Sequence, residues 1–317
     1  MKRWWRGWVA LWSYQEHPRS LALIRVCLGL CVLWDQAWIG LLDLVVPLFA
    51  PHEAGGFAEV LQRPYVGLWY QWLPAVPASA WLLWVGLIGS TLCWTLGLYT
   101  RPALLLFVLL SAQSAWVIPN ADRGIDILIR NLCLVLCASR CDGWLSLDAW
   151  RRTGSVWGDN GVVPAWPRHL IICQLVGMYF LAGIQKFGVH WSVFGNYNAL
   201  FLILQDPAIA NADYHWLQHQ PWLAITRIGT AMTVLWEWSA PLILWSFWCR
   251  HTQARPGALR AWTNRVRPHL WWAGIGVFFH IGIALTMDLG IFPFAMLATY
   301  WAFVHPNSLA RRSATAT

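Results

Sequence analysis

The chain has 317 residues, of which 58% are hydrophobic and only 11% are charged. Because an average soluble domain is about 25% charged, this composition excludes an ordinary soluble protein and indicates an integral membrane protein. The net charge of +8 does not indicate nucleic-acid binding, because its distribution follows membrane topology, as shown below. The 27 tryptophans are typical of aromatic belts at the two faces of a bilayer.

The N-terminal segment predicts a helix lying on the cytoplasmic surface of the membrane. Trp4, Trp8 and Trp12 recur at helical spacing among basic residues, which is typical of an interfacial amphipathic helix. The segment lacks the apolar core and cleavage site of a signal peptide. We therefore assign 1–19 to an interfacial segment, 20–305 to a transmembrane bundle and 306–317 to a short cytoplasmic tail.

Eight apolar stretches are long enough, or nearly so, to cross a bilayer, which takes about 20 helical residues. They are 20–39, 79–99, 102–118, 124–140, 168–187, 222–248, 271–288 and 290–305. The predicted fold class is therefore an all-α polytopic bundle of about eight spans. Gly290 and Pro293 predict a bent or re-entrant entry to the last stretch, and Pro241 predicts a loosened helix in the sixth. Since no internal repeat is visible, a transporter is the weaker interpretation.

The distribution of lysine and arginine predicts the orientation. With the N-terminus inside, sixteen of these residues lie in cytoplasmic segments and three lie outside, as the positive-inside rule requires. Both termini are then cytoplasmic. The long outer segments 40–78 (with Glu59 and Arg63) and 188–221 are expected to form short interfacial helices. The cytoplasmic loops 141–167 and 249–270 are expected to be simple connectors.

The eight cysteines predict neither disulfides nor a metal site. No CxxC pair is present and none of the cysteines falls in a predicted outer segment. Cys133, Cys137 and Cys141 share one helix face, where we interpret them as small packing residues.

Charged and polar residues inside the predicted spans are candidates for function, because an ionisable group is costly in hydrocarbon. Arg25 and Asp35 are about 15 Å apart along one helix, so each needs a partner elsewhere. Asp126 and Arg130 have the spacing of four that allows a pair on one helix face, and a structural ion pair is the favoured interpretation. Other polar residues are expected to line a cavity or to satisfy backbone groups: Glu237, His280, Tyr179 and Gln174.

Lys186 is the most informative of these residues. The chain has twenty arginines but only two lysines, and a lysine, unlike an arginine, can lose its proton when desolvated and act as a base. The alternative is an anchor that reaches to the membrane interface. On the predicted topology, Lys186 converges at the outer leaflet with Asp122, Arg123, His190 and Asp288, which predicts a polar pocket open to the outside.

Several segments, in order along nearly the whole chain, resemble one membrane-protein family. NADRGIDILIRNLCLVLCASRCDGWLSLD, QLVGMYFLAGIQKFGVHW and FFHIGIALTMDLGIFPFAMLA are similar to motifs of the horizontally transferred transmembrane domain (HTTM). That domain is shared with the membrane part of the vitamin K-dependent γ-carboxylase. LALIRVCLGLCVLWD and LGLYTRP fit its first span and its second-to-third turn.

The resemblance implies a role for Lys186. In the carboxylase, the lysine of the Gly-x-x-Lys motif is thought to deprotonate reduced vitamin K, and Lys186 matches that position. However, the carboxylase has an Asn-His pair where this chain has Gly124 and Ile125, and its large lumenal domain has no counterpart. We therefore do not expect glutamate carboxylation.

Two functions follow as hypotheses. The first is an enzyme of a bacterial plasma (inner) membrane in which Lys186 acts as a base on a lipophilic, quinol-like substrate. A reduced, vitamin K-like quinone is then the cofactor that the resemblance implies, and Asp126, Arg130, His280 and Glu237 support or line the pocket. The second is a non-enzymatic membrane partner in the maturation, export or immunity of a small secreted peptide.

Overall fold

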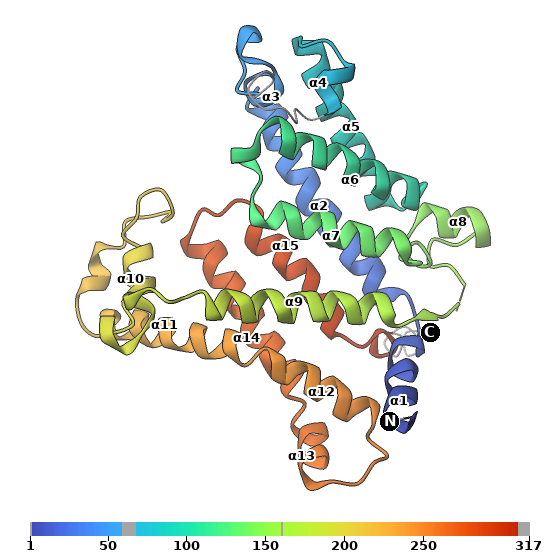
Figure 1. Cartoon of the computed structure of the whole chain (residues 1–317), viewed down its shortest axis with the longest axis vertical. Helices are drawn as coiled ribbons and strands as arrows, with labels where there is room; N and C mark the ends of the chain where they lie inside the picture. The colour runs from blue at the N-terminus through green and yellow to red at the C-terminus, as the bar shows by residue number, and fades with distance from the viewer. Residues whose placement is uncertain (1, 59–67, 160, 310–317) are drawn as a thin grey trace. The chain divides into compact units, whose positions relative to one another are not determined.

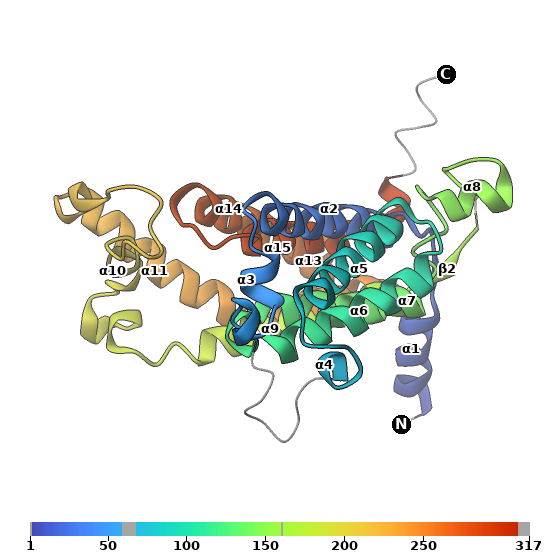
Figure 2. The same cartoon turned by 90° about the horizontal axis from the view of Figure 1, so that it is seen from above.

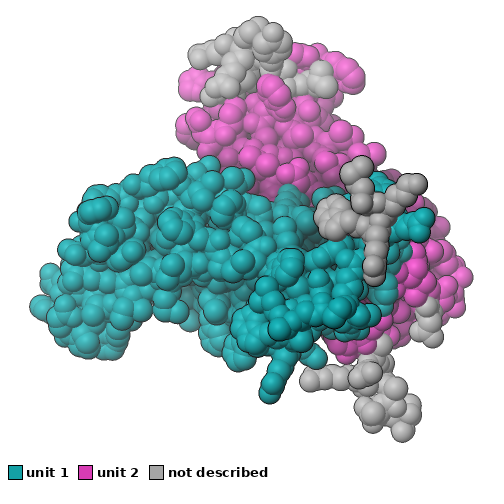
Figure 3. Space-filling model, turned by 60° about the horizontal axis from the view of Figure 1, so that its bottom comes forward, with its two compact units in different colours: residues 1–14, 168–303 teal, residues 15–167, 304–317 magenta. Residues whose placement is uncertain are grey.

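The computed structural model describes residues 2–58, 68–159 and 161–309. It is mostly helical, with two strands of two residues each. Two compact units are present, one of residues 1–14 and 168–303 and the other of residues 15–167 and 304–317 (Figure 3). Glu59, Arg63 and the end of the predicted tail from residue 310 onward lie outside the described residues.

The second unit is built on four helices, α2 (Arg19–Leu41), α5 (Pro77–Leu96), α6 (Thr100–Val117) and α7 (Gly124–Ala138). Helices α5, α6 and α7 follow one another side by side, and α2 lies against α5 (Figure 2). The two strands, β1 (Gln15–Glu16) and β2 (Val163–Pro164), pair antiparallel in this unit. Short elements complete it, namely α3 (Val45–Phe49), α4 (Leu68–Trp72), α8 (Leu147–Thr153) and the 3-10 turns η1 (His52–Ala54), η2 (Pro119–Ala121) and η7 (Pro306–Ser308).

The other unit contains α1 (Lys2–Ser13), α9 (Trp166–Ile184), α11 (Trp222–Trp238), α12 (Pro241–His251), α13 (Ala258–Val266), α14 (Pro268–Thr286) and α15 (Phe292–Thr299). The short helix α10 (Ala199–Ile203) lies against α11 (Figure 1). Four 3-10 turns join or follow these helices within the described residues, namely η3 (Val189–Trp191), η4 (Val193–Gly195), η5 (His215–Gln218) and, after α15, η6 (Tyr300–Phe303).

In the described parts of the chain, five helical stretches are long and apolar enough to cross a membrane, namely Arg19–Leu41, Pro77–Leu96, Thr100–Val117, Trp166–Ile184 and Ala258–Thr286, the last of which comprises α13 and α14. They coincide with five of the predicted spans. Many of their large apolar side chains are exposed, for example Leu30, Leu82 and Phe278. In water such exposure would be costly, whereas a lipid environment accommodates it.

The remaining predicted spans differ from the expectation. Helix α7 has 15 residues, and the predicted span 222–248 is broken into α11 and α12 between Trp238 and Pro241. The physical reason is Pro241, which occupies the first position of α12 and lacks the backbone N–H that a continuous helix needs. The predicted connector 249–270 is also not a plain loop, because it contains α13.

The predicted amphipathic N-terminal helix is present as α1, and the two predicted outer segments contain the short helices α3, α4 and α10. Their helical character is thus confirmed, and their position at a membrane surface stays a prediction. None of the eight cysteines, all of which the structure describes, forms a disulfide bond. Among the described residues, no group of three histidine, cysteine or acidic side chains is placed to hold a metal ion.

Candidate functional site

Lys186 and Glu237 form an ion pair in the unit of residues 168–303. The Lys186 Nζ atom lies 2.7 Å from Oε1 and 2.5 Å from Oε2 of Glu237. The lysine side chain is 18% exposed and the glutamate side chain 5%. Bonds this short between charged groups are strong, so the only lysine in the apolar part of the chain is held by a specific carboxylate.

The end of α9 explains how this contact arises. The helix stops at Ile184, and Lys186 follows in a turn closed by its backbone N–H to Gly183 O, 3.3 Å away. A Cβ atom at Gly183 would lie 2.9 Å from the Glu237 Cβ and 2.7 Å from the Trp238 ring. Glycine therefore lets α9 approach α11 closely enough for the lysine to reach Glu237.

An aromatic ring completes the surroundings of the ammonium group. The Lys186 Nζ atom lies 5.0 Å from the centroid of the Trp191 ring, at a distance where a cation–π interaction is favourable. The sequence interpretation did not single out Trp191, although it stands in the same quoted segment. Its spacing of five from Lys186 became meaningful only with the turn that follows α9.

The ion pair faces a cavity of about 570 Å³ enclosed mainly by α9, α10, α11 and α14. The walls are largely apolar, with Met178, Leu204, Phe278, Phe279 and Phe292 among them. Few polar side chains lie on the wall. Four of them can accept or donate a proton: Lys186, Glu237, Tyr179 and His280. An apolar cavity with a few convergent polar groups is the usual form of a small-molecule site.

A chain of three polar rings includes two that line this cavity, Tyr179 and His280. The Tyr300 hydroxyl donates to the Tyr179 hydroxyl at 2.9 Å, and Tyr179 lies 2.6 Å from the His280 Nε2 atom. Since the Tyr179 oxygen already accepts from Tyr300, its own proton goes to Nε2, and the imidazole proton is left on Nδ1. That Nδ1 atom is buried and has no hydrogen-bond partner among the described residues.

The aromatic neighbours hold these rings in place. Trp236 and Trp272 stack with their centroids 4.7 Å apart, and each indole N–H donates to the backbone carbonyl of the other residue at 3.0 Å. Tyr179 packs on the edge of both indoles. Tyr300 and this tryptophan pair were missed by the sequence interpretation, since nothing in their local pattern separates them from other core aromatics.

Three predicted site residues of this unit do not line the cavity. Gln174 is half-buried on α9, while His190 and Asp288 are exposed. The Asp288 backbone N–H bonds to Ile209 O at 2.7 Å, which ties the chain after α14 to the loop after α10.

The other predicted residues belong to the second unit, and the one pairing predicted there is not formed. Asp126 does not pair with Arg130. Instead, Arg130 pairs with Asp122 at 2.7 Å, and Asp126 pairs with Arg123 at 2.9 Å. The reason is the turn before α7, which brings Asp122 within reach of Arg130 and leaves Asp126 to cap the helix start at the Arg123 backbone N–H. Asp35 is satisfied by Arg123 at 2.8 Å, so it does have a partner on another element, as predicted.

Arg25 also finds its partners on other elements, and all of them are backbone carbonyls. Its guanidinium donates to Trp94 O, Thr95 O, Cys141 O and Leu145 O over 2.5 to 3.3 Å. The side chain is fully buried. Arg25 therefore joins the end of α5 to the loop after α7 and has a structural role.

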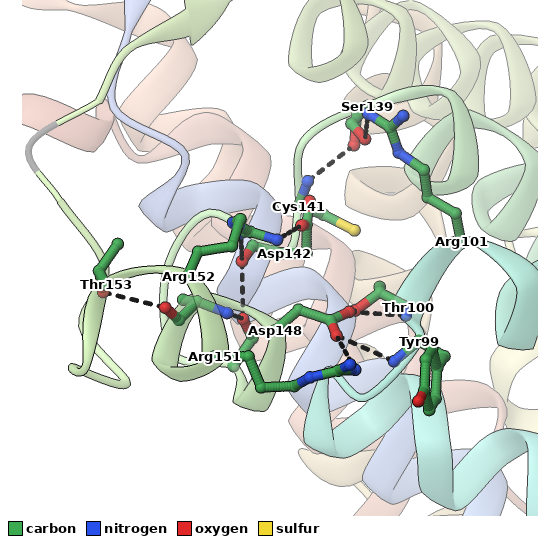
Figure 4. A network of polar contacts seen from close by, with 12 residues as sticks. Tyr99, Thr100, Arg101, Ser139, Cys141, Asp142, Asp148, Arg151, Arg152 and Thr153 are labelled. Carbon is green, nitrogen blue, oxygen red and sulfur yellow. Dashed lines mark hydrogen bonds and ion pairs between the residues drawn. The ribbon is translucent and has the colours of Figure 1, made fainter.

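The neighbouring polar network joins two of the motifs recognised in the sequence. Asp148 accepts from the Thr100 backbone and hydroxyl, each at 2.8 Å, and from the Tyr99 backbone at 3.1 Å (Figure 4). It thus caps the start of α6. Gly97 has a φ of 71°, and a Cβ there would lie 2.3 Å from the Ser146 Cβ, so the LGLYTRP and SLD segments meet at a position that requires glycine.

Comparison with known proteins agrees with the motifs. The family model described as the HTTM domain matches residues 14–246. This range contains Arg25, Asp148, Lys186 and Glu237, whereas His280 and Tyr300 lie beyond it. No curated protein and no solved structure matches the chain. Because the family model covers well over half of the sequence, the chain belongs to the HTTM domain family.

Proposed function

We propose that this HTTM protein is a polytopic protein of a bacterial plasma membrane, with about eight spans and both termini in the cytoplasm. Five long apolar helices support this, and the shorter α7, the broken α11–α12 and α15 with its following turn supply the other three spans. The excess of lysine and arginine in alternate segments supports the orientation. In this arrangement 1–19 is an interfacial segment, 20–305 is the bundle and 306–317 is a tail.

We propose that the cavity holds a lipophilic, quinol-like molecule and that Lys186 accepts its hydroxyl proton. The observation that carries this proposal is an ion pair of the single intramembrane lysine with Glu237 on the wall of a cavity of about 570 Å³. The largely apolar walls suit a hydrocarbon ring and tail. The ammonium and carboxylate are the oppositely charged pair that a substrate hydroxyl would meet there.

The pair gives a route for the proton. In the resting state Lys186 is an ammonium and Glu237 a carboxylate. Transfer of one proton from Nζ to the carboxylate gives a neutral amine and a neutral acid, a state that a desolvated site penalises less than water does. The amine lone pair then takes the hydroxyl proton of the substrate, which leaves an oxyanion next to the new ammonium.

His280 offers a second contact for the same molecule. Its Nδ1–H is a buried donor without a partner among the described residues, and leaving such a donor unsatisfied costs about 1–3 kcal/mol. The second oxygen of a quinol ring could accept this hydrogen bond. The Tyr179 and Tyr300 hydroxyls keep the imidazole in the tautomer that can donate.

The test uses an alkyl-substituted naphthol as the probe, because its absorption shifts when the hydroxyl ionises. We expect the purified protein to bind the probe and to raise the ionised fraction above that in detergent alone. Glu237→Gln should increase this fraction further, because a desolvated lysine without its counter-charge gives up its proton and is already a neutral amine when the probe binds. Lys186→Met combined with Glu237→Gln should bind the probe in its neutral form only.

Two results would count against the proposal. A probe that stays neutral in the unsubstituted protein would exclude Lys186 as the base, and a double variant that ionises the probe equally well would assign the effect to another group. Gln174→Leu is the matched control, since Gln174 lies on α9, which precedes Lys186, but not on the cavity wall, and it should leave the ionised fraction unchanged.

The second candidate function is a membrane partner for a small secreted peptide. It is favoured by two exposed aromatic side chains in the segment that follows Lys186, Phe187 and Phe194, which are 86% and 88% exposed. An exposed aromatic pair can dock an apolar peptide segment. Loss of peptide maturation or export on Phe187→Ser with Phe194→Ser, together with an unchanged naphthol spectrum, would favour this function over the enzymatic one.

A further inference from the structure

A second cavity lies within the unit of residues 1–14 and 168–303. It has a volume of about 340 Å³, and its walls are almost wholly apolar. They include Trp8 and Trp12 of α1, Cys173 of α9 and Trp245, Phe247 and Trp248 of α12. The amphipathic helix α1 therefore closes one side of a chamber that is large enough for part of a hydrocarbon chain.

Arginines lie behind one wall of this cavity, next to Phe247 and Trp248. The Phe247 ring packs against His269 with centroids 4.9 Å apart, and His269 lies within electrostatic reach of Arg250 and Arg267. The Arg255 guanidinium lies 5.6 Å from the centroid of the Trp248 ring. We call Arg250, Arg255 and Arg267 the arginine cluster.

The arginine cluster has no acidic counterpart near it in sequence. The helices α1, α12, α13 and α14 contain no aspartate or glutamate. Within the described parts of the chain, no member of the cluster forms an ion pair with a carboxylate. Burial, followed by the charges of Arg267 and Arg168, lowers the pKa of Arg250. An anion bound here would relieve this repulsion.

A buried hydrogen-bond donor on the cavity wall also lacks a partner. The indole N–H of Trp12 is buried on the cavity wall and has no partner among the residues that the structure describes. A buried donor of this kind favours an acceptor oxygen. The ligand must therefore combine an apolar chain, an acceptor such as an ester carbonyl, and an anionic group.

We infer that this cavity and the arginine cluster bind an anionic phospholipid of the leaflet that α1 faces. The acyl chain occupies the cavity, the ester carbonyl accepts from Trp12, and the phosphate meets Arg250 and Arg267. A soluble anion would use the arginines but would leave the apolar cavity unfilled, which is why a lipid is the occupant. This inference does not depend on the chemistry proposed for Lys186.

The experiment measures the thermal unfolding of the detergent-purified chain with dioleoylphosphatidylglycerol or dioleoylphosphatidylcholine added. A lipid at about a hundred times its dissociation constant should raise the unfolding temperature by ~5 °C for a protein of this size. We expect this rise with phosphatidylglycerol and not with phosphatidylcholine. Arg250→Gln with Arg267→Gln should remove it, and Cys173→Trp, which fills the cavity, should reduce it.

The matched control is Arg101→Gln with Arg140→Gln, which removes the same charge from two exposed arginines of the other unit and should keep the full rise. If both double variants lost the rise in unfolding temperature equally, net charge would explain the effect and the proposed site would be wrong. An equal rise in unfolding temperature with potassium phosphate alone would mean that the arginine cluster binds a soluble anion, and the assignment of a lipid would be wrong. No rise with phosphatidylglycerol in the unsubstituted protein would overturn the inference altogether.

Discussion

The Lys186 Nζ atom lies within 2.7 Å of both carboxylate oxygens of Glu237, although the two residues stand 51 positions apart in the chain. The pair connects the turn after α9 to the last helical turn of α11, directly before the break at Pro241. Lys186 and Glu237 thus act as a pair, and substitution of either residue leaves the other one without its counter-charge.

The first prediction concerns the stability of this pair. Lys186→Met leaves the Glu237 carboxylate, which is 5% exposed, without its counter-charge, and breaking a buried pair in this way costs about 3–5 kcal/mol. Adding Glu237→Gln should recover most of the loss, because the remaining buried charge is then gone. Thermal unfolding of the two variants in detergent measures the difference. If the single and double variants were equally unstable, the pair would not be the cause.

The second prediction tests the close approach of α9 and α11. Gly183→Ala places a Cβ 2.7 Å from the Trp238 ring, so the helices must separate, at a cost of about 1–3 kcal/mol. Gly177→Ala is the control, since a Cβ at that position of α9 meets nothing within 4 Å and alanine favours the helix. Unfolding temperatures should fall for the first variant and stay equal or rise for the second. The opposite order would contradict the close contact.

The third prediction concerns Arg25. Its guanidinium satisfies four backbone carbonyls, and the ammonium of lysine has only three donors that radiate from one atom. Arg25→Lys should therefore destabilise the protein by about 3 kcal/mol or more. Arg101→Lys, at an exposed arginine with one bond of 3.3 Å to Ser139 O, should have little effect. The check is the yield and unfolding temperature of each variant, and a stable Arg25→Lys protein would speak against this role.

The fourth prediction is a dependence on acid. Burial alone would raise the pKa of Asp148, but the hydrogen bonds from Thr100 and Tyr99 outweigh it and lower the pKa below the ordinary 3.8. Because the folded pKa is the lower one, the contribution to stability is present above the unfolded value and is lost as the pH falls through the folded value. Unfolding temperatures measured between pH 6 and pH 3 should therefore fall more steeply for the natural protein than for Asp148→Asn. Parallel curves for the two proteins would show that Asp148 does not cause the loss of stability in acid.

The sequence predicted much of the helical framework. Five of the predicted spans match long apolar helices, because about 20 consecutive apolar residues leave a chain few alternatives in lipid. It also indicated the break near Pro241, since proline removes a helical hydrogen bond wherever it stands. It did not predict α13 inside 249–270, because this helix has only nine residues and stands in an arginine-rich segment.

The ion pairs were harder to predict than the helices. A spacing of four suggested that Asp126 and Arg130 would pair, but the turn at Pro119–Ala121 brings Asp122 to Arg130 instead. Spacing along a helix tells which side chains share a face, and it says nothing of a competing carboxylate presented by a turn.

By itself, the sequence determined that this is a helical membrane protein of the HTTM family and that Lys186 is exceptional, because composition, apolar segment length and residue rarity are properties of the chain alone. Only the tertiary structure decided that Lys186 meets Glu237, that Tyr300 and Tyr179 orient His280, and that Arg25 and Asp148 hold the helices of the other unit. The physical reason is that each of these contacts joins helices far apart in the sequence. Their approach depends on side-chain packing, such as that at Gly183, and not on any local pattern.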